Sequence, residues 1–128
     1  MPPQTESIQE LLDFLPLLQH PDADFIRIGY WGDMTSRVSG ATAKNVYQHL
    51  FNNGFVLEDF DWEAWSEEAF AFEQNRHTLQ EADLPTLYKI LTVHLRADRL
   101  MEGHFDSILE NGFLADVLQR MKDIMANS

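Results

Sequence analysis

The chain has 128 residues and a mass of 14.8 kDa, the size of one domain with a substantial hydrophobic core. Acidic residues outnumber lysines and arginines 21 to 9, giving a formal net charge of −12, yet the 45% hydrophobic share is typical of a globular protein. The absence of cysteine excludes disulfides, thiolate metal sites and a cysteine nucleophile, and no apolar run is long enough to cross a membrane. The N-terminus has no signal-peptide pattern, so we expect a single domain over residues 1–128 in the cytoplasm.

The first predicted helix covers residues 7–19, where isoleucine and leucine recur at helical spacing. Ser7 and Glu10 fit a capping box at its start. Pro16 lies inside the pattern and should end or kink the helix near Phe14, because its ring displaces the carbonyl four residues earlier.

After a predicted turn at residues 20–24, the stretch 25–39 has β-type residues with partial alternation, which leaves a short hairpin and an extended loop both open. The next apolar stripe predicts a helix over residues 42–53, with Gly54 as its left-handed C-terminal cap.

A third helix is predicted to start after Asp61 as N-cap, with acids in its first turns. Its expected buried face carries Trp62, Trp65, Ala69 and Phe72. A fourth helix is predicted from Asp83, with Pro85 in its first turn, to a break at Gly103. It is apolar around much of its circumference, so we expect it to be central.

A short helix over residues 104–111, closed by Gly112, and an amphipathic helix over residues 113–125 complete the pattern. The sequence therefore predicts a mainly α fold. Its architecture is a compact bundle of about six helices, with a small β-hairpin near residues 25–39 as an open alternative.

From Gly54 to the C-terminus, the sequence resembles a family of small bacterial and phage-associated helical proteins of unknown function. The likeness is carried by Gly54-Phe55-Val56, Phe60-Asp61-Trp62 with Trp65, Ala82-Asp83-Leu84 with Leu87, Ile90-Leu91-Thr92, Arg96-Ala97-Asp98-Arg99-Leu100-Met101-Glu102-Gly103-His104 and Glu110-Asn111-Gly112. Members of the family usually have an aromatic residue where this chain has Leu100. The resemblance implies a helical fold and a bacterial or phage origin, and it implies no activity.

The polar run at the predicted helix break is the first candidate site. Arg96 and Arg99 share a helix face, and with Glu102 and His104 they could form a binding site for a small anionic ligand or a cryptic active site. The alternative is an Arg–Glu network that fastens this helix to the acidic helix after Asp61.

His94, Asp98 and Glu102 recur every four residues, a spacing that could present metal ligands or acid–base groups. A face of charged pairs is the favoured interpretation, because no established metal-binding motif is present. We therefore predict no metal and no cofactor, no catalytic residue is assigned, and the pattern argues against an enzyme.

The second candidate site is acidic. No lysine or arginine occurs between Lys44 and Arg76, and a field of this sign disfavours direct nucleic-acid binding. We expect a binding or accessory domain that contacts a protein partner of basic character through Glu58, Asp59, Glu63, Glu67 and Glu68. An acidic mimic of nucleic acid that inhibits a nucleic-acid-binding protein is an alternative, a membrane role is not predicted, and a homodimer is left open.

Overall fold

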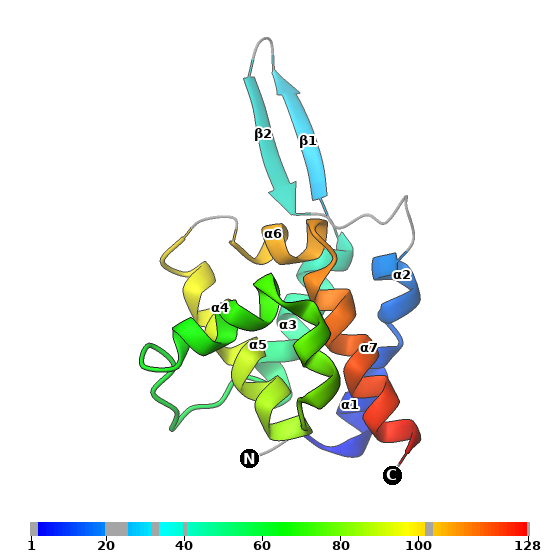
Figure 1. The fold of residues 1–128 in the computed structure, drawn as a ribbon. Coiled ribbons are helices and arrows are strands. Elements are labelled where there is room, and N and C mark those ends of the chain that lie inside the picture. The colour runs from blue at the N-terminus through cyan, green and yellow to red at the C-terminus, as the bar shows by residue number, and fades with distance from the viewer. Residues whose placement is uncertain (1–2, 20–25, 32–33, 40, 102–103, 128) are drawn as a thin grey trace.

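Seven α-helices, one 3₁₀ helix and two β-strands follow one another along the part of the chain that the computed structural model describes, residues 3–19, 26–31, 34–39, 41–101 and 104–127. In order they are α1 (Thr5–Leu12), α2 (Leu15–Gln19), β1 (Ile26–Trp31), β2 (Met34–Ser39), α3 (Ala41–Asn52), α4 (Ser66–Gln74), the 3₁₀ helix η1 (Arg76–Glu81), α5 (Leu84–Asp98), α6 (His104–Glu110) and α7 (Phe113–Ala126). The predicted mainly helical class is confirmed (Figure 1).

Helix α5 is the central element, as its broad apolar surface predicts. Nine of its residues are buried: Leu87, Tyr88, Ile90, Leu91, Thr92, Val93, His94, Leu95 and Ala97. A helix buried on so many sides must be covered by several neighbours. The hydrophobic core around it takes side chains from every α-helix of the described chain except α4, which adds the partly buried Phe72.

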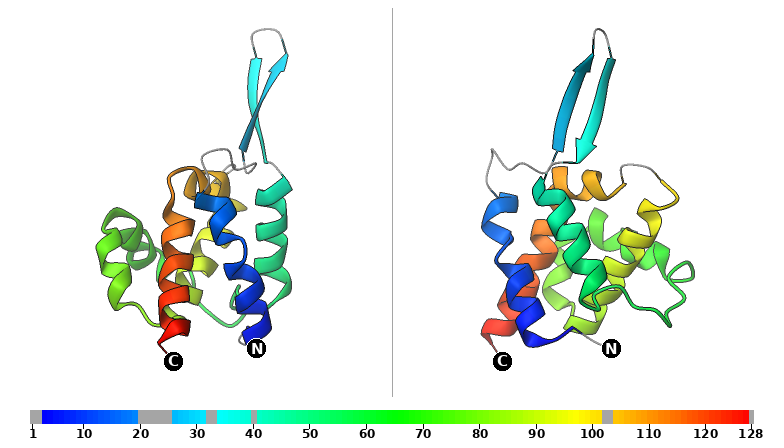
Figure 2. Two further views of the ribbon diagram at one scale, coloured as in Figure 1. Left: turned by 90° about the vertical axis from the view of Figure 1, so that its right-hand side faces the viewer. Right: turned by 180° about the vertical axis from the view of Figure 1, so that it is seen from behind.

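The other helices lie around α5 in two groups. Helix α1 contacts both α3 and α7, and the three run side by side in Figure 2. Helix α4 packs on α5, and η1 joins α4 to α7. The acidic segment before α4 therefore lies on the same side of the molecule as α4 and α5 (Figure 1).

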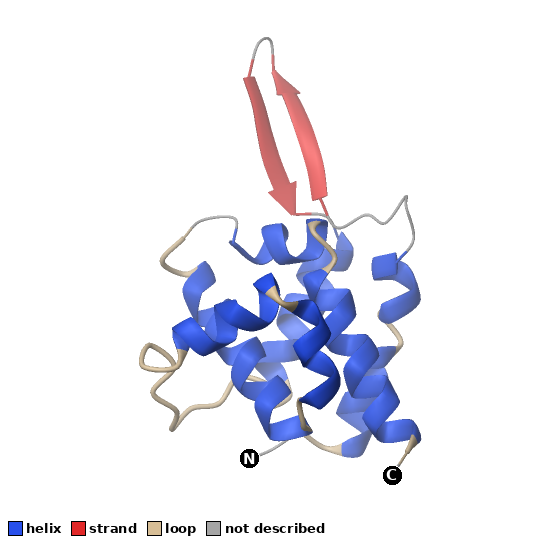
Figure 3. Ribbon diagram, viewed as in Figure 1, coloured by secondary structure: helices blue, strands red, loops and turns tan. Residues whose placement is uncertain are grey.

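Strands β1 and β2 pair antiparallel, with Ile26 opposite Ser39 and Trp31 opposite Met34. They lie in the stretch where the sequence left a hairpin and an extended loop open. Figure 3 shows the pair extending away from the helical body.

The N-terminal helix differs from the prediction at its start. It begins at Thr5, and its N-cap residue makes no side-chain capping bond, so the predicted capping box is wrong. Ser7 instead lies inside α1 and donates to the Asn53 Oδ1 atom at 3.2 Å. The predicted break is confirmed: α1 ends at Leu12, and Pro16 occupies the first turn of α2, where its missing N–H costs no helical hydrogen bond.

Two further boundaries also differ. Helix α4 begins at Ser66 and not after Asp61; the intervening residues form turns, in which the Asp61 carboxylate accepts the Ala64 N–H at 3.4 Å. Helix α5 ends at Asp98, short of the predicted break at Gly103. Two predicted caps are confirmed. Asp83 caps the start of α5 by accepting the Thr86 N–H at 3.0 Å, and Gly54, which follows α3, adopts φ 82°.

Candidate functional site

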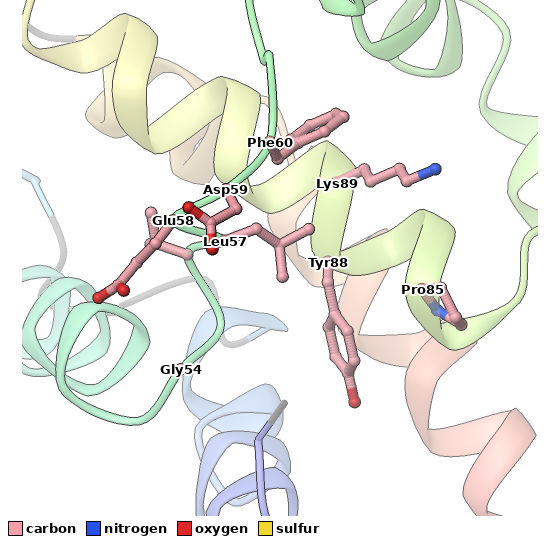
Figure 4. A pocket seen from close by; sticks show the side chains of 9 residues that line it. Gly54, Leu57, Glu58, Asp59, Phe60, Pro85, Tyr88 and Lys89 are labelled. Carbon is pink, nitrogen blue, oxygen red and sulfur yellow. The ribbon is translucent and has the colours of Figure 1, made fainter. Parts of the chain in front are cut away.

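A groove of about 550 Å³ lies between the chain that follows α3 and the first half of α5. Its size is that of a small-ligand or peptide side-chain site. The residues that line it are Gly54, Val56, Leu57, Glu58, Asp59, Phe60, Pro85, Tyr88 and Lys89 (Figure 4).

One buried threonine of α5 fixes the wall of this groove. The Leu57 N–H donates to the Thr92 Oγ1 atom at 2.9 Å, and the Thr92 hydroxyl donates to the Tyr88 carbonyl at 2.8 Å. Phe55, two residues before Leu57, is fully buried and packs its ring against Tyr88 with centroids 6.0 Å apart. The Thr92 hydroxyl also lies 3.4 Å from the Phe55 carbonyl oxygen, a second acceptor. The segment is therefore tied to α5 by the Thr92 hydroxyl and one buried ring, and these contacts define the wall of the groove.

The floor of the groove is apolar and its rim is charged. Val56 and Tyr88 are buried, and burial raises the pKa of the Tyr88 hydroxyl above its ordinary value. Glu58 and Asp59 are exposed, and neither makes an ion pair with another residue of the described chain. Lys89 places its ammonium 5.7 Å from the centre of the Phe60 ring, so the one lysine of the groove faces an aromatic side chain.

The five acids predicted to bind a partner are all exposed, and they belong to three different segments of the chain. Glu58 and Asp59 lie at the groove. Glu63 lies in the turn before α4, whereas Glu67 and Glu68 lie in the first turn of α4. Negative side chains are favoured there by the positive end of the helix dipole, so these last two have a structural reason to be present.

The residues of the predicted arginine site make separate contacts with different parts of the fold. The guanidinium carbon of Arg99 lies 5.3 Å from the centre of the Phe51 ring, so Arg99 joins the end of α5 to α3. Among the described residues no ion pair links it to the acidic helix. Burial raises the pKa of Tyr47 in α3, and the Asp98 charge raises it further, whereas a hydrogen bond from Arg99 lowers it. Arg96 is half-buried, and Glu102 lies outside the described residues.

His104 belongs to a buried pair that the sequence did not reveal. The Nε2 atom of His104 and the Nδ1 atom of His94 are 2.8 Å apart, and the two ring planes lie within 5° of each other. The ring centroids are 5.0 Å apart, a distance accounted for by one ring radius on each side of the hydrogen bond. The imidazoles therefore meet edge to edge in nearly the same plane, and one nitrogen must donate while the other accepts.

Aromatic rings surround this histidine pair. Phe70 meets both imidazoles edge-on, and Phe113 lies 5.1 Å from His94. His94 is fully buried, and its Nε2 atom has no hydrogen-bond partner among the residues that the structure describes. Burial, together with the neighbouring charge of His104, lowers the pKa of His94 to about 3.

His104 is less buried and faces carboxylates. Burial lowers its pKa, and the charges of Glu73 and Asp98 act in the opposite direction. Asp98 also accepts the Phe105 N–H at 2.8 Å, which caps the start of α6. Among the described residues no three His, Asp or Glu side chains are grouped to hold a metal ion, so the His94–Asp98–Glu102 spacing gains no support there.

Comparison with known proteins places the whole chain in one family. The model of a family of unknown function, DUF6508, matches residues 3–127. The chain belongs to this family. No curated protein and no solved structure matches it. The match extends over the first fifty residues too, where the sequence resemblance had not reached.

Membership of DUF6508 assigns no activity, so function has to be argued from the geometry of the chain itself. Within the described residues no helix has the length and apolar character needed to cross a bilayer. The sequence pattern identified Glu58 and Asp59, but it missed the groove beside them. The signal it could have used is Thr92, a polar residue inside the apolar run of the predicted central helix.

Proposed function

We propose that this chain is a protein-binding domain that takes a basic and apolar segment of its partner in the groove between residues 54–60 and α5. The observation that carries the proposal is the juxtaposition of two exposed carboxylates, Glu58 and Asp59, with an apolar floor made by Val56 and Tyr88. An arginine or lysine side chain has both matching parts, an apolar stem and a cationic head.

The charge distribution supports the same kind of partner. The net charge of −12 and the absence of lysine and arginine between Lys44 and Arg76 give this side of the molecule a negative field. Such a field raises the association rate of a basic partner and repels nucleic-acid backbones. The single lysine at the groove lies over Phe60 and Trp65 at 5.7 and 5.9 Å from their ring centres. Within the described part of the chain it forms no ion pair with Glu58 or Asp59.

The alternative of an anionic-ligand site or active site at Arg96, Arg99, Glu102 and His104 has less support. Arg99 lies on Phe51, and His104 is hydrogen-bonded to His94, so two of the four side chains already have structural partners. The mimicry hypothesis also has less support, because the five exposed acids are divided among a groove, a turn and a helix N-terminus.

The test is selection of peptides from a random 12-residue display library on the immobilised chain. We expect enriched peptides to combine arginine or lysine with leucine, methionine or phenylalanine. Glu58→Lys with Asp59→Lys should weaken the binding of a synthesised winner by about tenfold or more, which corresponds to about 1.4 kcal/mol.

Glu67→Lys with Glu68→Lys is the matched control, because it makes the same change of charge on exposed residues outside the groove. The control should retain most of the affinity at about 0.15 M salt, where charges separated by more than ~8 Å are largely screened. Equal loss in both variants would mean that only net charge matters, and absence of any enrichment would refute the groove as a peptide site.

A further inference from the structure

An exposed apolar turn lies at the end of α5 that is remote from the groove. Leu100 is 75% exposed and Met101 48% exposed. The turn is well defined, because the N–H groups of both residues donate to the Ala97 carbonyl, at 3.0 and 2.8 Å. Two adjacent apolar side chains are thus presented on a hydrogen-bonded backbone.

The charges beside this turn are positive, opposite in sign to the carboxylates of Glu58 and Asp59 at the rim of the groove. Arg99 is exposed and Arg96 half-buried, so two guanidinium groups accompany Leu100 and Met101. The carboxylate of Asp98, which lies between the two arginines in sequence, is engaged with the Phe105 N–H at 2.8 Å. We call Leu100 and Met101 with these arginines the α5 tip.

The α5 tip does not fill the groove of its own chain. Tyr88 in the groove and Leu100 in the tip are twelve residues apart along α5 and its last turn, which corresponds to about 18 Å at ~1.5 Å per residue. None of the tip residues lines the groove, and among the described residues no ion pair joins Arg96 or Arg99 to Glu58 or Asp59. A tip that fills the groove would therefore come from another molecule.

We propose that this chain associates head to tail with further copies of itself, the α5 tip of one copy inserting into the groove of the next. This inference rests on the proposed function and names the partner of the same groove. Leu100 and Met101 would cover the apolar floor. Arg99 would keep its guanidinium over the Phe51 ring and, because it is exposed, would offer its remaining N–H groups to Glu58 and Asp59. If both tip–groove pairs can form at once, two copies close as a two-fold dimer; a head-to-tail contact that cannot be made reciprocally builds rings or open chains.

The contact is small and joins two copies that each carry a charge of −12. Interfaces of this size are weak and transient, and the repulsion between copies is screened only at moderate salt. The association should therefore be measured by sedimentation velocity at about 0.15 M salt and at concentrations up to about 1 mM. We expect the weight-average mass of the natural chain to rise with concentration.

Two variants make the test specific. Leu100→Ser with Met101→Ser removes the tip and keeps the groove, whereas Glu58→Lys with Asp59→Lys damages the groove and keeps the tip. Each variant alone should remain monomeric, because one half of every contact is missing. An equimolar mixture should form a one-to-one dimer that grows no further, because only one functional tip–groove pair exists in it.

A natural chain that stays monomeric over this range would overturn the inference, as would a tip variant that oligomerises alone or a mixture without dimers. The Glu67→Lys, Glu68→Lys variant should associate as the natural chain does. The tip variant also separates the two proposals, because it should still bind selected peptides. Peptide binding without self-association would refute only the inference, whereas self-association without peptide enrichment would refute only the broader proposal of foreign partners.

Discussion

Acidification should destabilise this protein through His94 before its carboxylates begin to titrate. The pKa of this imidazole is about 3 in the folded chain, against 6.5 for an ordinary histidine, and burial without a partner for Nε2 is the main cause. The folded state therefore binds fewer protons than the unfolded state at any pH between these values. Its stability is complete above pH 6.5 and falls progressively toward pH 3.

The size of the effect follows from the two pKa values. Each unit of difference corresponds to about 1.4 kcal/mol, so the full loss is about 5 kcal/mol, and the part already lost at pH 5 is about 2 kcal/mol. A loss of this size is a large fraction of the 5–15 kcal/mol that holds a typical domain folded. The lowered pKa of His104 acts with the same sign and adds to it.

Urea denaturation at pH 7 and pH 5, followed by tryptophan fluorescence, measures the difference. We expect His94→Phe to lose about 2 kcal/mol less than the natural chain between these two pH values, because phenylalanine cannot take up a proton. His77→Gln, a change at an exposed histidine of η1, is the matched control and should keep the natural pH dependence. An equal loss in the natural chain and in His94→Phe would show that His94 is not the group responsible.

Three other substitutions test individual contacts, each by urea denaturation at pH 7. Thr92→Val removes the acceptor of the Leu57 N–H and should lower the free energy of unfolding by about 1–3 kcal/mol. The Leu57 amide hydrogen should also exchange faster, and an unchanged exchange rate would mean that the groove wall does not depend on this bond. Asp83→Ala removes the N-cap of α5 and should cost about 1 kcal/mol, whereas Asp83→Asn should retain most of the stability. Gly112→Ala should cost about 1 kcal/mol of stability, because the backbone φ angle is 83° there. The added methyl group would lie 3.6 Å from Arg76, which is an ordinary contact, so a much larger loss would mean that packing and not backbone strain is responsible.

The sequence predicts well those helices whose burial repeats with the helical period. Helices α3, α5 and α7 each carry a continuous apolar stripe, and the structure places them within a few residues of the predicted bounds. The segment after Asp61 is different, since its tryptophans and acids also follow a helical spacing. There the chain forms turns up to Trp65, whose ring packs beside Phe60 with centroids 6.0 Å apart and lies 5.9 Å from the ammonium of Lys89 in α5. Spacing along the sequence does not register these contacts.

The candidate sites depend on tertiary contacts that spacing cannot supply. Glu58 and Asp59 could be identified as acidic, but the groove beside them exists because Leu57 is bonded to Thr92, thirty-five positions away in the sequence. His94 was assigned to a charged face with Asp98, because the two lie four residues apart. The structure turns His94 inward, where α4 and α7 supply Phe70 and Phe113 as its neighbours.

The core of the described chain contains only two buried polar side chains, Thr92 and His94, and both lie on α5. A buried polar group costs free energy unless its hydrogen bonds are made, so each should be associated with something that an apolar residue could not do. Thr92 bonds to the segment that forms the groove, and its bonds offset the cost of burial. His94 joins α5 to α6 through His104, but its second nitrogen stays unbonded. An apolar residue at position 92 should therefore damage the groove and lower stability. At position 94 it should loosen α6, recover part of the burial cost and remove the sensitivity to acid.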